Sequence, residues 1–201
     1  MDNRNIAISL PSCGEEEWQA VQEPIMTGWL TQGPKVAAFE KAFAERHQVK
    51  HAIATTSCTT ALHLILAALG IGEGDEVIVP AFTWVATANV VLYCGATPVF
   101  VDVDRETFNL DVSQVKAKIS DRTKAIIPVH LFGLCADMDA LAAAAPGIPL
   151  IEDAACAAGS AYKGRPAGSL GLAGAFSFHP RQLFNVYLTA VTLGTARRTF
   201  G

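Results

Sequence analysis

Short apolar segments alternate with helical segments through most of the 201-residue chain. The segments expected as strands are 51–55, 76–80, 98–101, 124–129, 149–151 and 175–178. The helices expected between them are 59–69, 83–93, 111–119 and 137–145. Strands and helices that alternate with short connections predict right-handed crossovers, and therefore a mostly parallel sheet. The fold class is α/β, in three layers with helices on both faces of the sheet.

Two more helices are expected before the first of these strands. Ser12 and Glu15 form a capping-box pattern, which predicts a helix that continues to about Ile25. Pro34 suits the first turn of a helix, and the apolar spacing after it predicts a helix that runs to His47. We expect His47 to lie at a solvated helix end, without a functional role.

Composition limits the class of protein. Hydrophobic residues make up 51% of the chain and charged residues 17%, a balance that suits a sheet buried on both faces. The net charge of −4 provides no basic surface for nucleic acid or for an anionic membrane. No apolar run is long enough to span a bilayer, and the polar first residues do not resemble a signal peptide.

The cysteines indicate the compartment. They are odd in number, widely spaced and without a C-x-x-C pair, a pattern that argues against a disulfide framework and against a zinc site. We therefore expect no metal, and reduced thiols in a cytoplasm. The five cysteines are Cys13, Cys58, Cys94, Cys135 and Cys156.

Polar and aromatic residues follow several of the expected strands, at the sheet edge where parallel strands bind ligands. Hydroxyls around Ser57 precede a helix and could form an anion site, although ordinary helix capping by Ser57 or Thr59 is the better explanation for these residues alone. Trp84 could stack on a planar ring or fill the core. Asp153 could hold a protonated ring nitrogen or cap the residues after it. With Ser177, these residues could supply what pyridoxal phosphate needs: a phosphate cradle, a ring platform and a partner for the ring nitrogen.

A serine hydrolase is the alternative considered for the glycine-rich stretch before the last strand. Residues 167–171 approach the nucleophile-elbow pattern around Ser169, but they lack its first glycine and no strand leads into them. A motif without its structural context is weak, so this alternative is disfavoured.

Several long segments together resemble one known family. They are GWLTQGPKVAAFEKAFA (28–44), TTSCTTALHL (55–64), GDEVIVPAFTWVATAN (74–89), ATPVFVDVD (96–104), TKAIIPVHLFG (123–133), IEDAACAAGSAYKGRPAGSLG (151–171) and FSFHPR (176–181). From Met1 to Arg181 the chain resembles the DegT/DnrJ/StrS family of pyridoxal-phosphate-dependent sugar aminotransferases. The resemblance implies the large domain of the aspartate-aminotransferase-like fold (fold type I), a homodimer, and amino transfer from glutamate to a nucleotide-linked keto-sugar.

The resemblance also implies roles for particular residues. Trp84 would stack on the cofactor ring, Asp153 would keep the pyridine nitrogen protonated, and Cys156 would lie beside the ring hydroxyl, where many members have His or Gln. The residues that would bind the phosphate are Ser57, Cys58 through its backbone, and Ser177. The residues that would line the sugar pocket are Gly28, Trp29, Leu30 and Thr31. The corresponding division is an N-terminal helix and substrate loop (1–33), a cofactor-binding large domain (34–181) and a divergent tail (182–201).

The chain departs from the family at Gln182. Family members place the Schiff-base lysine directly after the FSFHPR segment, and here Gln182 occupies that position. Because an amide is neither a nucleophile nor a base near neutral pH, we expect no catalytic residue there. Any pyridoxal phosphate or pyridoxamine phosphate would then be bound non-covalently, and the chain alone would be inactive.

The tail raises further expectations. The family's C-terminal small domain is expected to be absent. In the fold that the resemblance implies, an antiparallel strand lies between the first and the sixth strands. Residues Asn185–Leu193 are β-prone and apolar, so they are predicted to fill that position, which would otherwise leave two strand edges unpaired. Two alternative functions stay open: a non-catalytic protein that binds cofactor or forms a dimer, and a dehydratase-like enzyme. The second is disfavoured because Gln182 is not the His of such relatives.

Overall fold

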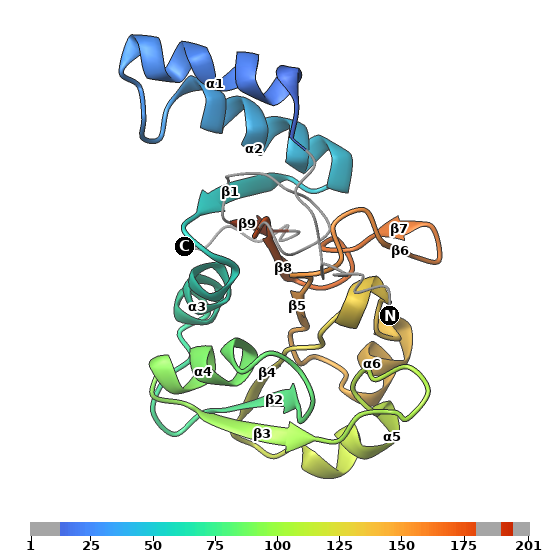
Figure 1. The fold of residues 1–201 in the computed structure, drawn as a ribbon. Coiled ribbons are helices and arrows are strands. Elements are labelled where there is room, and N and C mark those ends of the chain that lie inside the picture. The colour runs from blue at the N-terminus through green and yellow to red at the C-terminus, as the bar shows by residue number, and fades with distance from the viewer. Residues whose placement is uncertain (1–12, 180–189, 195–201) are drawn as a thin grey trace, which may run out of the picture.

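The computed structural model describes residues 13–179 and 190–194. The strands are β1 (His51–Thr55), β2 (Glu76–Pro80), β3 (Thr97–Val101), β4 (Thr123–Ile126), β5 (Ile151–Asp153), β6 (Ala161–Tyr162), β7 (Arg165–Pro166), β8 (Ala173–Ser177) and β9 (Ala190–Gly194). The α-helices are α1 (Glu15–Thr27), α2 (Pro34–His47), α3 (Cys58–Ala68), α4 (Ala86–Tyr93), α5 (Val112–Val115) and α6 (Met138–Ala144). Short 3-10 turns are η1 (Lys116–Lys118) and η2 (Leu131–Gly133). Figure 1 shows their arrangement.

The strands join into a mostly parallel sheet, as predicted. β3, β2 and β4 form one parallel group, and β5 pairs in parallel with β8. Isolated parallel bridges, Ile126 with Leu150 and Val129 with Asp153, connect the two groups. The order is therefore β1-β9-β8-β5-β4-β2-β3. The hairpin of β6 and β7 lies outside this sheet.

The tail supplies the antiparallel strand that was predicted from the sequence. β9 pairs antiparallel with β1 on one side and with β8 on the other, with Ala190 opposite both Thr55 and Ser177. β9 therefore lies between β1, the first strand, and β8, the sixth of the strands expected from the sequence. This confirms the predicted strand for its C-terminal part, whereas residues 185–189 lie outside the described residues.

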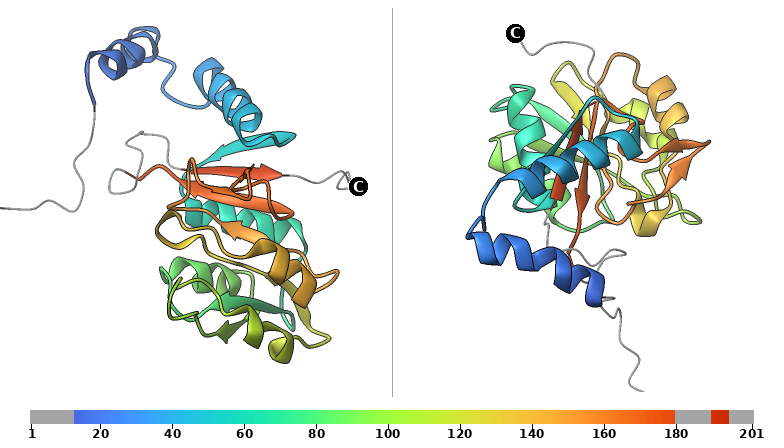
Figure 2. Two further views of the ribbon diagram at one scale, coloured as in Figure 1. Left: turned by 90° about the vertical axis from the view of Figure 1, so that its right-hand side faces the viewer. Right: turned by 90° about the horizontal axis from the view of Figure 1, so that it is seen from above.

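Helices cover both faces of the sheet, which confirms the three-layer architecture (Figure 2). On one face, α3 and α4 pack on alternate residues of the central strands, among them Val77, Ala125 and Ile151. On the other face, α5 and α6 pack on the intervening residues Ile78 and Ile126. All five residues of β2 are buried because both of its faces are covered.

Local structure differs from the sequence-based expectation at several helix ends. The cap of α1 is Gly14, whose N–H donates to Glu17 at 2.7 Å, whereas Ser12, the cap expected from the sequence, lies outside the described residues. α4 begins at Ala86 and not at Thr83, because the residues after β2 bend along the sheet edge before the helix starts. Among the described residues of α1, none is buried.

His47, at the end of α2, is buried and does not lie at a solvated helix end as expected from the sequence. It is 2% exposed, and its Nδ1 lies 2.7 Å from the carbonyl oxygen of Ala167. Its ring packs on Phe43 and Phe176 at centroid distances of 4.2 and 4.8 Å. The solvated helix end expected for His47 is therefore wrong, because β8 and the loop before it cover the C-terminal turn of α2.

Candidate active site

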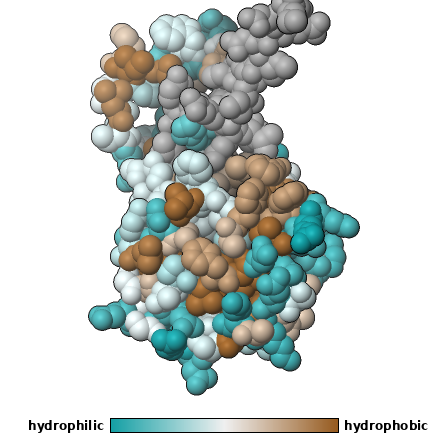
Figure 3. Space-filling model, turned by 60° about the horizontal axis from the view of Figure 1, so that its bottom comes forward, coloured by the Kyte–Doolittle hydropathy of each residue, from teal (hydrophilic) through white to brown (hydrophobic). Residues whose placement is uncertain are grey.

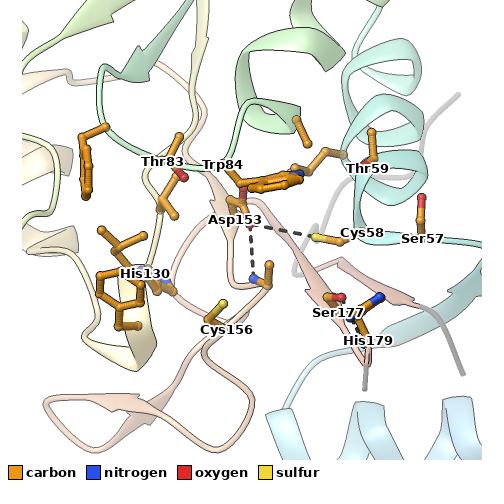
Figure 4. A pocket seen from close by; sticks show the side chains of 17 residues that line it. Ser57, Cys58, Thr59, Thr83, Trp84, His130, Asp153, Cys156, Ser177 and His179 are labelled. Atoms are coloured by element: carbon orange, nitrogen blue, oxygen red, sulfur yellow. Dashed lines mark hydrogen bonds between the residues drawn. The ribbon is translucent and has the colours of Figure 1, made fainter. Parts of the chain in front are cut away.

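The carboxyl ends of the parallel strands border a pocket of about 790 Å³. It is lined by the ends of β5 and β8, the start of α3 and the segments that follow β2 and β4. The residues proposed from the sequence as a cofactor site all line it: Ser57, Cys58, Trp84, Asp153, Cys156 and Ser177. Figure 4 shows these side chains gathered around Asp153 from elements that are far apart in the sequence.

Asp153, at the end of β5, is buried among hydrogen-bond donors. Its Oδ2 accepts from the Thr87 hydroxyl at 2.7 Å, and its Oδ1 accepts from the Ala155 N–H at 3.2 Å. Burial raises the pKa of Asp153, because the ionised carboxylate loses its hydration, while the bonds from Thr87 and Ala155 act in the opposite direction. A carboxylate in this setting favours a cationic hydrogen-bond partner such as a protonated ring nitrogen. The bond from Ala155 also realises the capping role considered as the alternative.

Hydroxyl groups gather at the N-terminus of α3, on another wall of the pocket. Ser57 is the N-cap residue, and its Oγ accepts from the Thr60 N–H at 3.0 Å. The Thr60 hydroxyl lies 2.9 Å from Ser57 Oγ and 3.1 Å from Thr56 Oγ1. The capping alternative is therefore correct for Ser57. It does not compete with anion binding, because the N–H groups and the dipole of the first helical turn remain at the pocket.

Aromatic side chains line the pocket beyond the buried carboxylate. Trp84 is 78% exposed, so the alternative in which it fills the core is wrong. Phe82 and Phe132 also line the pocket and are 52% and 77% exposed. Large apolar rings left exposed beside a polar group fit a ligand that carries a planar ring.

The two thiols in the pocket are not suited to nucleophilic chemistry. Burial raises the pKa of Cys58 well above its ordinary value, and the negative charge of Asp153 adds to the effect. Burial likewise raises the pKa of Cys156. Only the thiolate is a good nucleophile, so both residues are expected to act as neutral, space-filling groups.

Sequence reasoning missed several residues of the site. His130, Leu131 and Phe132 line the pocket because they follow β4 at the same edge as the predicted groups. The strand-edge rule would have found them, had it been applied to the fourth strand as well as to the first, second, fifth and sixth. Thr87, in the first turn of α4, was missed because only the fold brings its hydroxyl to Asp153.

Two parts of the predicted site are not in the pocket as described. Gly28, Trp29, Leu30 and Thr31 lie in the loop between α1 and α2, and the described lining of the pocket does not include them. The Trp29 indole N–H instead donates to the Gln32 carbonyl at 2.9 Å, within the loop itself. Gln182 lies outside the described residues. Substrate contact by the loop and the role of position 182 remain predictions.

The described residues, 13–179 and 190–194, provide neither a metal site nor a membrane-spanning helix. They contain no group of three His, Cys, Asp or Glu side chains that could hold a metal ion. Within the same ranges, no helix combines the length and the apolar character needed to cross a membrane.

The fold and this pocket are those of the large domain of a pyridoxal-phosphate-dependent protein of fold type I. Comparison with known proteins leads to the same class. The model of the DegT/DnrJ/EryC1/StrS aminotransferase family matches residues 11–187. The chain therefore belongs to this family, which confirms the resemblance inferred from its motifs.

Individual relatives support the assignment. Spore coat polysaccharide biosynthesis protein SpsC of Bacillus subtilis (strain 168) is 50% identical over 179 residues, which are 88% of this chain and 46% of SpsC. GDP-perosamine synthase of Caulobacter vibrioides is 51% identical over 180 residues, 88% of this chain and 48% of that protein. Spr1654 of Streptococcus pneumoniae, described as a sugar aminotransferase and solved in its PMP form, superimposes with a TM-score of 0.92 at 36% identity over 96% of this chain and 53% of its own. The chain spans about half the length of these relatives.

Proposed function

We propose that the chain forms the cofactor-binding part of a pyridoxal-phosphate-dependent nucleotide-sugar aminotransferase, which transfers an amino group from glutamate to a nucleotide-linked keto-sugar. The observation that carries the proposal is the buried carboxylate of Asp153, which shares one pocket with Trp84 and the N-terminus of α3. The family membership and the PLP and PMP forms of Spr1654 support the same cofactor. The name of the Caulobacter relative supports a GDP-linked sugar.

The residues of the pocket fit pyridoxal phosphate. When bound, this cofactor supplies a conjugated ring that accepts electrons from the carbon at which the amino group is transferred. Asp153 would accept a hydrogen bond from the ring nitrogen and keep its proton in place. Trp84 would stack on the ring and exclude water from one face. The hydroxyls of Ser57 and Ser177 and the first N–H groups of α3 would hold the phosphate.

Other features support the finer parts of the proposal. Hydrophobic residues are exposed on the face drawn in Figure 3, where they are coloured brown. Over the described residues, the exposed large hydrophobic side chains include Leu64, Leu92, Tyr93 and Phe100, which are 50% to 59% exposed. A homodimer would cover such a surface.

All five cysteines are free thiols, which fits a reducing cytoplasm. We propose a division into an N-terminal helix and substrate loop (1–33), a cofactor-binding large domain (34–181) and a divergent tail (182–201).

Titration of the chain with pyridoxal phosphate tests the proposal. We expect saturable, non-covalent binding that leaves the aldehyde absorbance of the cofactor in place, because Gln182 offers no amine. The binding should be followed by absorbance and calorimetry, with pyridoxal lacking the phosphate as the control ligand. An affinity for pyridoxal equal to that for pyridoxal phosphate would contradict the role assigned to the N-terminus of α3.

We expect no amino transfer by this chain alone. Turnover requires an amine that bonds to the cofactor and then moves a proton, and an amide does neither. The measurement is 2-oxoglutarate production from glutamate with a GDP-linked keto-sugar. Gln182→Lys should allow covalent capture of the cofactor, detected as a mass increase after borohydride reduction, whereas Gln182→Met should not. Steady, keto-sugar-dependent 2-oxoglutarate formation by the unmodified chain would contradict the prediction.

Trp84→Ala is expected to weaken pyridoxal phosphate binding modestly. The loss of ring stacking corresponds to about 0.5–1.5 kcal/mol, or roughly 2- to 12-fold in the dissociation constant. Trp84 is 78% exposed, so the thermal stability of the variant should change little. Trp29→Ala is the matched control, because Trp29 is also exposed but lies outside the described lining of the pocket. If the two variants bound pyridoxal phosphate with equal affinity, the stacking role proposed for Trp84 would be wrong.

A further inference from the structure

A second carboxylate, Glu152, lies directly before Asp153 in β5 and is completely buried. Successive strand residues point to opposite faces of a sheet, so Glu152 points away from the pocket into which Asp153 points. The function described above makes no use of it. Burying a carboxylate completely costs folding free energy unless its oxygens accept hydrogen bonds, so Glu152 must have donors around it.

Glu152 receives hydrogen bonds from two separate segments of the chain. Its Oε1 accepts from the N–H groups of Leu170 and Gly171, both at 2.7 Å. Its Oε2 accepts from the Gly168 N–H at 2.6 Å and lies 2.9 Å from His130 Nε2. With two donors on each oxygen, the ionised form is the one that fits the site, because a protonated oxygen would place a hydrogen against a donor.

The second ring nitrogen of His130 determines the tautomer. His130 Nδ1 accepts from the Ala136 N–H at 3.2 Å, so it carries no proton. The proton therefore lies on Nε2, which donates to Glu152. The imidazole of His130 therefore bridges Glu152 and Ala136. Through this bridge, the Glu152 carboxylate also holds the turn of residues 131–136 in place. This turn contains Phe132, which lines the pocket and has a positive φ of 52°.

The other segment leads into β8. The loop of residues 168–171 packs so closely on this strand that a Cβ on Gly174 would lie 2.8 Å from Gly168 Cα. β8 continues to Ser177, which lines the same pocket as the turn that follows His130. Glu152 therefore connects three pocket-bearing segments: its own strand with Asp153, the turn after His130, and the loop that precedes β8.

We propose that Glu152, acting with His130, is a positioning residue that sets the relative placement of the pocket walls around Asp153. The hydrogen bonds of Glu152 and His130 form a preorganised network, because each donor in it has an acceptor. Residues that surround a binding site in this way fix the positions of the groups that contact the ligand. The identity of the ligand rests on the proposed function, whereas the linkage of the three segments does not.

Glu152→Gln tests the proposal with little change in shape. Whichever way the amide is oriented, its NH₂ group faces two of the four donors, and His130 cannot switch tautomer without leaving the Ala136 N–H without an acceptor. Glu76→Gln is the matched control. Glu76 is 7% exposed and binds Ser120 and Arg122, but it begins β2 at the end of the strand away from the pocket.

Two measurements are made on the full chain. Hydrogen–deuterium exchange of the ligand-free protein should rise in both 130–136 and 168–171 in Glu152→Gln, and in neither segment in Glu76→Gln. Pyridoxal phosphate should bind Glu152→Gln about tenfold or more weakly, with reduced induced circular dichroism at the cofactor band, while Glu76→Gln should keep wild-type affinity.

The outcomes separate this inference from the proposed function. If wild-type protein does not bind pyridoxal phosphate, the proposed function fails and the exchange measurement alone decides the role of Glu152. Unchanged exchange in 130–136, or an affinity equal to that of Glu76→Gln, would overturn the positioning role. If Glu152→Gln does not fold, His130→Phe replaces it. This variant keeps Glu152 and removes the imidazole bridge, so exchange should rise in 131–136 more than in 168–171, and unchanged exchange in 131–136 would overturn the positioning role.

Discussion

Replacing Asp153 with asparagine is expected to weaken pyridoxal phosphate binding by about 10- to 100-fold. A hydrogen bond to a charged group contributes about 1.5–3 kcal/mol, and the neutral amide cannot stabilise a protonated ring nitrogen as a carboxylate does. The change is nearly isosteric: the amide oxygen can still accept from the Ala155 N–H, and the amide NH₂ can donate to the Thr87 hydroxyl, which reverses the direction of that bond. Calorimetric titration at neutral pH measures the effect.

The same substitution is expected to stabilise the ligand-free chain. Burial raises the folded-state pKa of Asp153, so the folded state binds more protons than the unfolded state between the unfolded pKa of about 3.9 and the raised folded value. Stability contributed by Asp153 therefore falls as pH rises through that window. The stability of Asp153→Asn relative to the wild type should therefore increase with pH across this window and stop changing with pH below the unfolded pKa. Thermal unfolding of both proteins over a pH series measures the difference.

Asp137→Asn is the control with the opposite sign. The bonds from the Tyr162 hydroxyl at 2.6 Å and from the Ala140 N–H at 3.0 Å lower the pKa of Asp137. Its stabilising contribution is present above the unfolded pKa and is lost as pH falls through the folded value. Asp137→Asn should therefore lose stability at neutral pH and keep its cofactor affinity. If Asp153→Asn behaved in the same way as Asp137→Asn, the cofactor role of Asp153 would be wrong.

Phe176→Ala should cost the most stability among the single changes considered. Phe176 is completely buried and packs edge-on against Phe43 at a centroid distance of 5.3 Å and against His47 at 4.8 Å. Truncation of such a ring costs about 3–5 kcal/mol. This is a large part of the roughly 5–15 kcal/mol that stabilises a typical domain. The expected loss in melting temperature is about 6–20 °C for a chain of this size.

Urea and thermal unfolding measure the loss, and Phe100→Ala provides the comparison. Phe100, on the edge strand β3, is 50% exposed, so its truncation should cost clearly less. Phe176 joins α2 to β8, and its loss should also release α2 toward local unfolding. A similar loss in the two variants would mean that α2 contributes little to the stability of the sheet.

Much of the fold could be predicted because its signals are local. Strand segments such as 51–55 and 76–80 were located within a residue of their observed bounds, since period and length distinguish buried strands from helices. The alternation of the two implies crossovers of one hand, and therefore a parallel sheet whose ligand edge is known in advance. That rule placed Trp84, Asp153 and Ser177 at one pocket, although they lie far apart in the sequence.

By itself, the sequence determined the order of the elements, the parallel sheet, the strand provided by the tail and the edge at which the ligand groups meet. The order of the elements, the parallel sheet and its ligand edge follow from periodicity, turn chemistry and chain handedness, which are properties of neighbouring residues. The place of the tail strand follows from the fold that the family resemblance implies. Only the tertiary structure decided that His47 is buried, that Thr87 bonds Asp153, and that Glu152 is held by His130 and by the loop before β8. The physical reason is that burial and hydrogen-bond partners come from segments distant in the sequence, which no local pattern specifies.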